Sequence, residues 1–114
     1  MAGCIFCRIV KKEIPAQVEH EDERVMAFKD INPQSPVHML VIPKKHIPSL
    51  NGLAPEDEAL VGHLFSVIRL LAGRAGVAGP GYRVVVNCGE EGGQVVDHLH
   101  FHLLGGRVMG WPPG

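Results

Sequence analysis

Three histidines near the C-terminal end of the chain alternate with apolar residues, in the order His98-Leu99-His100-Phe101-His102. Successive side chains of a β-strand point to opposite faces, so this spacing predicts that the three imidazoles project from one face. Same-face neighbours lie about 6.6 Å apart along a strand, which lets the imidazoles span a phosphate group and its flanks. Packing three imidazoles together costs desolvation and charge repulsion, so a functional role explains the pattern better than a structural one.

Two kinds of chemistry fit three histidines on one face. Neutral imidazole is a common zinc ligand, so the three could hold a catalytic metal ion. Alternatively, one imidazole is a nucleophile while its neighbours orient it and bind an oxyanion. An unperturbed imidazole with a pKa of ~6.5 is largely neutral at pH 7. A phosphoryl group needs fixed hydrogen-bond donors for its oxygens more than it needs a strong base. The residue pattern alone leaves both readings open.

A glycine-rich segment at residues 87–94, Asn-Cys-Gly-Glu-Glu-Gly-Gly-Gln, leads directly into the histidine strand. Glycines let backbone N–H groups approach and surround an anion. Hairpins also use glycine, so the loop is informative only because it delivers the chain to the histidines. Neither a GxxxxGK[ST] loop nor a GxGxxG fingerprint is present in the sequence.

The elements that must position these residues are predicted from periodicity and turn signals. Residues 55–72 form the one long helix, because Pro55 suits a first helical position and apolar residues recur every three or four positions. A short helix is expected at residues 4–12. Strands are expected at 18–21, 25–28, 38–42, 82–87 and 97–104. The order of elements predicts a single α+β domain over residues 1–114, with an antiparallel sheet of about five strands.

Composition narrows the function classes. The chain is 46% hydrophobic and 20% charged with a net charge of −1, so it lacks the basic excess expected of a nucleic-acid-binding protein. No apolar run reaches the ~18 residues of a membrane span, and no signal peptide is recognisable. Three cysteines favour a reducing compartment over a disulfide framework. We therefore expect a cytoplasmic protein with a small ligand, without a nucleic-acid or membrane partner.

The string HLHFHLL at residues 98–104 resembles the HxHxHxx signature of the histidine triad family. The similarity extends over nearly the whole chain, and the motifs resemble those of the Hint branch, the purine nucleoside phosphoramidases. The matching segments lie at residues 4–9, 13–16, 28–38, 41–46, 81–87, 92–94, 104–107 and 111–114. The resemblance implies a fold of the histidine triad type that dimerises into a continuous sheet.

The activity implied by the resemblance is hydrolysis of purine nucleotide conjugates of the adenosine 5'-monophosphoramidate type. By similarity, His100 is the nucleophile that forms a transient nucleotidyl-histidine, and no cofactor is required for catalysis. His102 matches the residue that contacts the phosphate and the leaving group. His98 and His38 match residues that hold the nucleophilic imidazole in place. Such a role is physically reasonable, because the tautomer must leave one nitrogen unprotonated for attack.

The nucleotide-binding residues follow from the same resemblance. Asp30 matches the acid that hydrogen-bonds the ribose hydroxyls, and Trp111 matches a residue that reaches the partner's active site in Hint homodimers. The apolar walls of the purine site correspond to Phe6, Ile9, Phe28 and Ile31. The phosphate-binding loop corresponds to Asn87, Gly93 and Gln94.

The chain departs from the family pattern at Val95, where Hint enzymes commonly carry serine. The backbone N–H of Val95 can still donate, but the hydroxyl donor is lost, at a cost of ~1.5–3 kcal/mol where water does not replace it. We expect the reaction class to persist. The departure keeps open an alternative function, a non-catalytic sensor or adaptor that binds purine nucleotides.

Cys4 and Cys7 have the spacing of a chelating pair, but two ligands do not make a zinc site. Some bacterial members of the family with this motif add two histidines, which correspond here to His46 and His98. The resemblance thus implies a structural zinc tetrad. The alternative is that the two cysteines are small apolar residues of the first helix.

Overall fold

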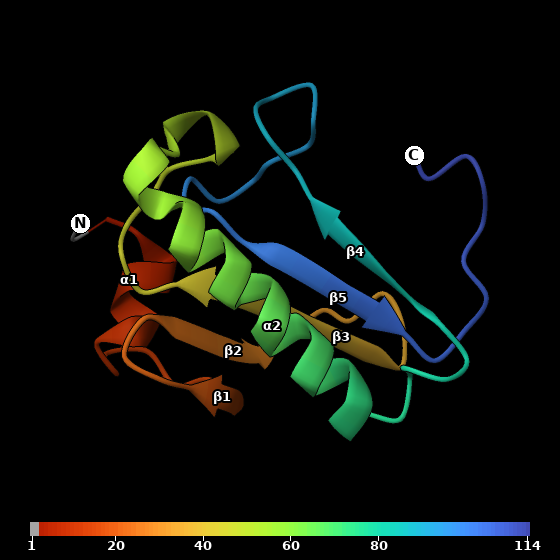
Figure 1. Cartoon of the computed structure of the whole chain (residues 1–114). Coiled ribbons are helices and arrows are strands. Elements are labelled where there is room, and N and C mark those ends of the chain that lie inside the picture. The colour runs from red at the N-terminus through yellow and green to blue at the C-terminus, as the bar shows by residue number, and fades with distance from the viewer. Residues whose placement is uncertain (1–2) are drawn as a thin grey trace.

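A five-stranded antiparallel sheet forms the centre of the computed structural model, which describes residues 3–114 (Figure 1). The strand order is β1-β2-β3-β5-β4, and every neighbouring pair is antiparallel. The strands are β1 (Val18–Glu21), β2 (Val25–Lys29), β3 (Val37–Pro43), β4 (Tyr82–Val86) and β5 (Phe101–Gly105). The predicted α+β class with about five antiparallel strands is confirmed.

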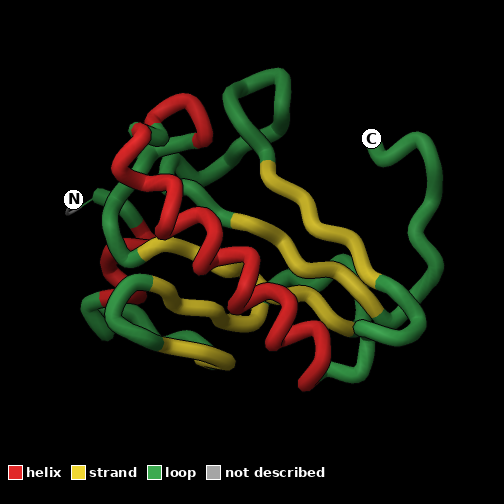
Figure 2. Tube along the Cα trace, in the orientation of Figure 1, coloured by secondary structure: helices red, strands yellow, loops and turns green. Residues whose placement is uncertain are grey.

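Two α-helices accompany the sheet in the described part of the chain (Figure 2). The helical elements are α1 (Ile5–Val10), η1 (Leu50–Gly52), η2 (Pro55–Asp57) and α2 (Glu58–Arg74). The predicted helix at residues 55–72 therefore begins with a 3-10 turn. Asp57 explains this start, because its carboxylate accepts the N–H of Ala54 at 2.9 Å and also pairs with Lys45 Nζ at 2.7 Å.

The helix α2 lies across one face of the sheet, and its apolar side forms the main core. Its buried residues Leu64, Ile68 and Leu71 pack in one cluster with Leu99 and Leu103. Burying an aliphatic side chain of this size contributes roughly 1.5–3 kcal/mol. The three- and four-residue spacing that predicted the helix is thus the spacing of its buried face.

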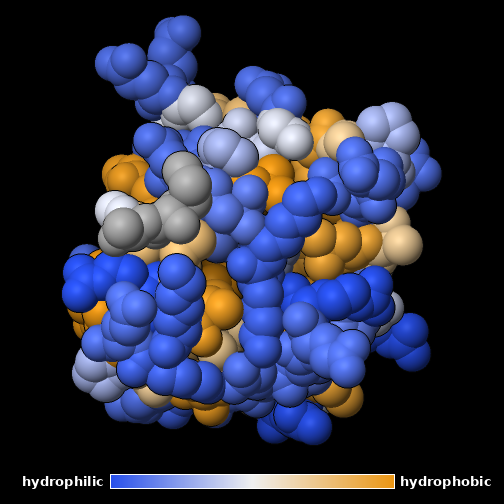
Figure 3. All heavy atoms as spheres, turned by 90° about the vertical axis from the view of Figure 1, so that its left-hand side faces the viewer, coloured by the Kyte–Doolittle hydropathy of each residue, from blue (hydrophilic) through white to orange (hydrophobic). Residues whose placement is uncertain are grey.

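A second, smaller core lies on the opposite face of the sheet, beneath α1. It consists of six buried residues, Phe6, Ile9, Met26, Phe28, Leu40 and Ile42. Strand β2 is therefore buried on both faces, and its residues alternate between the two cores. Viewed from the α1 side, hydrophobic atoms lie in the spaces between hydrophilic side chains (Figure 3). Because α1 has only six residues, it covers this face incompletely.

The last strand begins later than the alternation predicted. Strand β5 starts at Phe101, whereas residues 97–100 form no ladder with a neighbouring strand. The partner strand β3 ends at Pro43, which has no N–H to donate. Leu99 instead donates its N–H to the carbonyl of Ile47 at 2.7 Å. The expectation of a strand over residues 97–104 is thus wrong for its first four residues.

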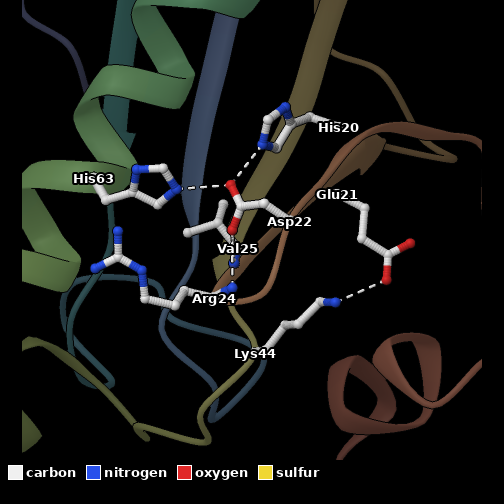
Figure 4. Close-up of polar contacts among 7 residues, drawn as sticks. All are labelled: His20, Glu21, Asp22, Arg24, Val25, Lys44 and His63. Carbon is white, nitrogen blue, oxygen red and sulfur yellow. Dashed lines mark hydrogen bonds and ion pairs between the residues drawn. The ribbon is translucent and has the colours of Figure 1, made fainter.

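Asp22 links the turn between β1 and β2 to helix α2 through hydrogen bonds (Figure 4). Its Oδ1 accepts the backbone N–H groups of Arg24 and Val25 at 2.8 and 2.9 Å. Its Oδ2 lies 2.7 Å from Nε2 of both His20 and His63. Partial burial acts to raise the pKa of Asp22, but these hydrogen bonds outweigh it and hold the pKa well below its usual range.

None of the helices within residues 3–114 combines the length and the apolar character needed to cross a membrane.

Candidate active site

A cavity of about 290 Å³ opens between α1, the end of β2 and the segment that leads into β5. The volume is at the lower end of the range for small-molecule sites. Its walls are mainly apolar, and His100 and His102 supply imidazoles to its lining. Eight of the sequence-predicted residues line it: Phe6, Ile9, Phe28, Asp30, Ile31, Val95, His100 and His102. The structure therefore places two of the three triad histidines, His100 and His102, in the same cavity as the apolar residues predicted to surround a purine.

The buried imidazole of His100 is fixed as a single tautomer. Its Nδ1 lies 2.7 Å from the carbonyl oxygen of His98, which can only accept, so Nδ1 carries the proton. Nε2 therefore has a free lone pair. The edge-on ring of Phe6, with its centroid 5.2 Å away, packs against the imidazole. The arrangement is that of an oriented nitrogen nucleophile.

A chain of hydrogen bonds sets the proton of His102. The N–H of Gln34 donates to Nδ1 of His38 at 3.0 Å, so the proton of His38 lies on Nε2. That Nε2–H donates to Nδ1 of His102 at 2.9 Å. The proton of His102 is therefore on Nε2, where it can donate to an anion in the cavity.

Burial keeps both of these imidazoles neutral. It lowers the pKa of His102 to about 4, and the neighbouring imidazoles of His100 and His38 lower it further because a charge on His102 would be repelled by theirs, while the carboxylate of Asp30 opposes the shift. Burial likewise lowers the pKa of His38, against the opposing effect of Asp30. At neutral pH the hydrogen-bond chain through the two rings therefore stays intact.

His98 does not share a face with the other two triad histidines, contrary to the sequence expectation. Its ring is fully buried and its Nδ1 points toward Cys4 and Cys7. Within residues 3–114, the three triad histidines do not form a group with metal-sized separations between their ligand atoms. The expectation failed because residues 97–100 leave the strand geometry on which it relied.

Asp30, His38 and His102 also bring three ligand atoms close together. The tautomer of His38 argues against a metal ion at this group. Nδ1 of His38 accepts a backbone N–H, so its Nε2 carries a proton and offers no lone pair to a cation. We interpret this group as a hydrogen-bonded network.

The four predicted metal ligands, Cys4, Cys7, His46 and His98, converge at the start of α1. The Sγ of Cys4 lies 3.3 Å from Nδ1 of His98, and the Sγ of Cys7 lies 3.2 Å from Nδ1 of His46 and 3.6 Å from that of His98. The two Nδ1 atoms are 3.2 Å apart. A tetrahedral zinc ion with Zn–S of ~2.3 Å and Zn–N of ~2.0 Å separates two nitrogen ligands by about 3.3 Å, a sulfur and a nitrogen by about 3.5 Å, and two sulfurs by about 3.8 Å. The donor set and its spacing fit such an ion.

The surroundings of the cluster orient its donors. Nε2–H of His98 donates to the carbonyl of Pro43 at 2.8 Å, which leaves the Nδ1 lone pair free for a metal ion. The Sγ of Cys4 accepts the N–H of Cys7 at 3.3 Å. Burial, with the neighbouring Cys4, raises the pKa of the Cys7 thiol, so a cation would be needed to hold it as a thiolate.

Several predicted phosphate contacts are engaged within the glycine-rich loop itself. The N–H groups of Gly93 and Gln94 donate to Glu90 and Gly89, each at 3.0 Å. The Gln94 side chain accepts from the N–H of Gly89 and donates to the carbonyls of Pro48 and Val96. These groups hold the shape of the loop. Their contact with a phosphate stays a prediction, as does that of Asn87, which is not among the cavity residues.

The backbone N–H of Val95 has no hydrogen-bond acceptor among residues 3–114. Unlike the N–H groups of Gly93 and Gln94, it is free to donate to a ligand. The Val95 side chain is 89% exposed at the cavity. Trp111 is also exposed and lies outside the cavity of its own chain, so its role at a partner's site stays a prediction.

The sequence analysis missed some cavity residues. Ile14, Leu40 and Val96 line the cavity, but an apolar residue in a turn or strand carries no signal that separates a ligand wall from ordinary core. It also missed Gln34, which acts through its backbone N–H and could have been found only from the loop geometry.

Comparison with known proteins gives a consistent result. The family model of the HIT domain matches residues 11–109. An uncharacterized HIT-like protein of Synechocystis is 52% identical over 110 residues, covering 96% of both chains. A crystal structure of a HIT family hydrolase from Legionella pneumophila is 48% identical and superposes with a TM-score of 0.97, covering 98% of this chain and 100% of the other. A histidine triad protein from Clostridium difficile is 44% identical with a TM-score of 0.94, covering 96% of each.

Proposed function

The chain belongs to the histidine triad (HIT) family, and on this premise we propose that it is a nucleotide hydrolase that cleaves purine nucleoside phosphoramidates. The name of the Legionella relative supports hydrolysis as the reaction class. One observation carries the proposal: the proton on Nδ1 of His100 is held by the carbonyl of His98, so Nε2 is a free nucleophile at an apolar cavity. The substrate class comes from the resemblance to the Hint branch.

The reaction proceeds in two steps. Nε2 of His100 forms a bond to the α-phosphorus while the P–N bond of the substrate breaks, and the leaving nitrogen takes one proton from solvent and departs as the amine. The resulting imidazolium keeps its Nδ1–H bond to His98, which stabilises the positive charge. Water then attacks phosphorus, the bond to Nε2 breaks and the nucleoside monophosphate is released, while one proton passes to solvent.

Neighbouring groups bind the substrate. Nε2–H of His102 and the free N–H of Val95 donate to the phosphate oxygens, where charge develops in the transition state. The purine lies between Phe6, Ile9 and Phe28, and the carboxylate of Asp30 accepts hydrogen bonds from the ribose hydroxyls.

We also propose that Cys4, Cys7, His46 and His98 bind a structural zinc ion. A closed set of four protein ligands leaves no open position for a substrate, so the ion takes no part in the two steps above. When bound, it neutralises the thiolates and links α1 to the segments after β3 and before β5.

A homodimer is the final part of the proposal. Strand β4 has a hydrogen-bonded neighbour on only one side in the sheet, so a second copy can extend the sheet there. Trp111 is 82% exposed in the single chain, and in the dimer it would be covered by the partner or would reach the partner's active site. Size-exclusion chromatography with light scattering gives the mass, and a strictly monomeric active protein would contradict the dimer.

Turnover of a panel of nucleoside phosphoramidates and dinucleoside polyphosphates tests the proposed activity. We expect adenosine or guanosine phosphoramidate to be hydrolysed. His100→Ala should lower kcat by at least 10³-fold while changing the Kd for AMP by less than about threefold. His63→Gln, in the Asp22 cluster, is the matched control and should retain activity. A wild-type protein that binds AMP but turns over none of the panel would instead be a nucleotide sensor.

A further inference from the structure

We propose that the metal cluster of Cys4, Cys7, His46 and His98 positions the nucleophile His100, so that metal occupancy switches the site between an ordered and a disordered arrangement. The activity consequence rests on the proposed function, whereas the structural consequence does not. Three features of the structure carry the inference.

The first feature is the way the nucleophile is supported. His100 lies on residues 97–100, which have no strand ladder to either side. The described backbone hydrogen bond of this segment to another part of the chain runs from Leu99 N–H to Ile47 O. Leu99 follows His98 and Ile47 follows His46, so this bond joins residues adjacent to two cluster ligands. The Leu99 side chain is anchored in the main core, so the cluster supports the opposite side of the segment, which carries the His98 and His100 imidazoles.

The second feature is that His98 belongs to both sites. Its ring supplies Nδ1 to the cluster, and its carbonyl accepts Nδ1–H of His100 at 2.7 Å. Metal ligation of the His98 ring therefore restrains the same residue whose carbonyl fixes the His100 tautomer, and a backbone shift at His98 on metal loss would displace that acceptor. Displacements of about 1 Å at a reacting group can lower a rate by two orders of magnitude.

The third feature connects the cluster to His100 through helix α1. Phe6 lies between the ligands Cys4 and Cys7, and its ring packs edge-on against both His98 and His100, with centroids 5.8 and 5.2 Å away. Fixing the two cysteines fixes α1 and hence this contact. The His100 imidazole is thus held by the cluster from two sides, through His98 and through Phe6.

The rest of the fold does not depend on the cluster in this way. The main core between α2 and the sheet contains none of the four ligands. Loss of the metal ion should therefore loosen residues 97–100 and α1 while α2 and the paired strands stay folded. A local rather than a global response distinguishes this inference from a purely stabilising role.

Comparison of zinc-loaded protein with protein stripped by a chelator tests the inference. Three readouts are needed: amide hydrogen exchange at Leu99, the ¹⁵N imidazole signals of His100, and far-ultraviolet circular dichroism. On stripping we expect exchange at Leu99 to accelerate at least tenfold relative to α2 amides, and the His100 signals to shift or broaden. Turnover should fall by about 10–100-fold, the range seen when the support of a site is lost, and zinc should restore it.

Cys7→Ser should reproduce the stripped state, and Cys88→Ser is its matched control. Cys88 is the third free cysteine, belongs to neither the cluster nor the cavity lining, and should leave all three readouts unchanged.

Unchanged Leu99 exchange and His100 signals in the metal-free protein would overturn the inference. Global loss of circular dichroism would also overturn it, because the cluster would then hold the whole fold. Failure of the wild type to bind zinc stoichiometrically has the same consequence. If the zinc-loaded protein hydrolyses no phosphoramidate, the proposed function fails, while the exchange and imidazole readouts still decide this inference.

Discussion

His38 donates Nε2–H to Nδ1 of His102 across 2.9 Å, and this contact determines which nitrogen of His102 faces the cavity with a proton. The backbone N–H of Gln34 fixes the tautomer of His38 from the other side. The backbone N–H of Gln34 thus determines, through two neutral imidazoles, that His102 presents an N–H donor to the cavity.

Replacement of His38 by phenylalanine keeps a ring of similar volume but removes the donor to His102. His102 then loses its preference for the Nε2–H tautomer, and we expect kcat to fall by about 10–100-fold, as for other losses of an orienting hydrogen bond. Steady-state kinetics and ¹⁵N signals of His102 measure the two effects. His20→Gln, which alters a histidine of the Asp22 cluster, should change neither. An unaltered His102 tautomer in His38→Phe would contradict the assigned chain.

The stability of the protein should decrease in mild acid because of His102. Its folded pKa is about 4, below the ~6.5 of an unfolded chain, so the unfolded state binds more protons between these values. The contribution of the neutral ring is complete above pH ~6.5 and is lost as the pH falls toward 4. We expect this loss to be on the order of 2 kcal/mol, since the ring is partly exposed and partly screened.

Urea unfolding at pH 7.5 and pH 4.5 measures this effect. His102→Gln should show a smaller difference in the free energy of unfolding between the two pH values than the wild type does. Subtracting the pH dependence of the variant from that of the wild type removes the contributions of the acid-sensitive groups that do not contact His102, including the proposed metal ligands. Equal pH dependence in both proteins would show that His102 is not buried in its neutral form.

The comparison of sequence and structure is most instructive at the histidine triad. Alternation predicted the apolar face of β5 correctly, since Phe101 and Leu103 are buried in the main core. It failed at His98, because strand geometry ends where the partner strand reaches Pro43. The position of a strand end depends on hydrogen bonds to residues more than 50 positions away, which periodicity does not contain.

The group of Cys4, Cys7, His46 and His98 illustrates the opposite case. A CxxC spacing alone did not justify a site, and only the family resemblance connected it to His46 and His98. The structure places all four donors at ligand separations. In contrast, neither residue spacing nor the family resemblance predicted that the Gln94 side chain holds the shape of the glycine-rich loop. Its side chain bonds to backbone groups of Gly89 and Pro48, and such contacts depend on the loop path.

Asp22 offers a test of the contacts that tie the β1–β2 turn to α2. In Asp22→Asn an amide N–H₂ group can replace Oδ2 and face the two Nε2–H donors of His20 and His63. Loss of these charge-assisted hydrogen bonds should lower the free energy of unfolding by about 1–3 kcal/mol. Activity at pH 7.5 should change by less than about twofold, because Asp22 is not a cavity residue.

Chemical denaturation and turnover measure these two outcomes in parallel. The control is Glu56→Gln, which neutralises an exposed acid near the start of α2 and should alter stability by no more than about 0.5 kcal/mol. A similarly small effect of Asp22→Asn would mean that the two imidazoles contribute little to holding the turn.

Val95 is the position where this chain departs from the serine common in Hint enzymes, and the structure indicates what the change should do. The side chain is 89% exposed at the cavity, so replacing it sacrifices little packing and should alter stability by less than about 0.5 kcal/mol. Val95→Ser adds a hydroxyl donor beside the free backbone N–H. A further hydrogen bond to a charged phosphate oxygen should raise kcat/KM for a nucleoside phosphoramidate by about 3–10-fold. Val95→Ala is the matched control, because it removes the same methyl groups without adding a donor. If alanine and serine raise kcat/KM equally, the gain comes from relief of crowding at the cavity mouth, and the hydroxyl has no role in binding the phosphate.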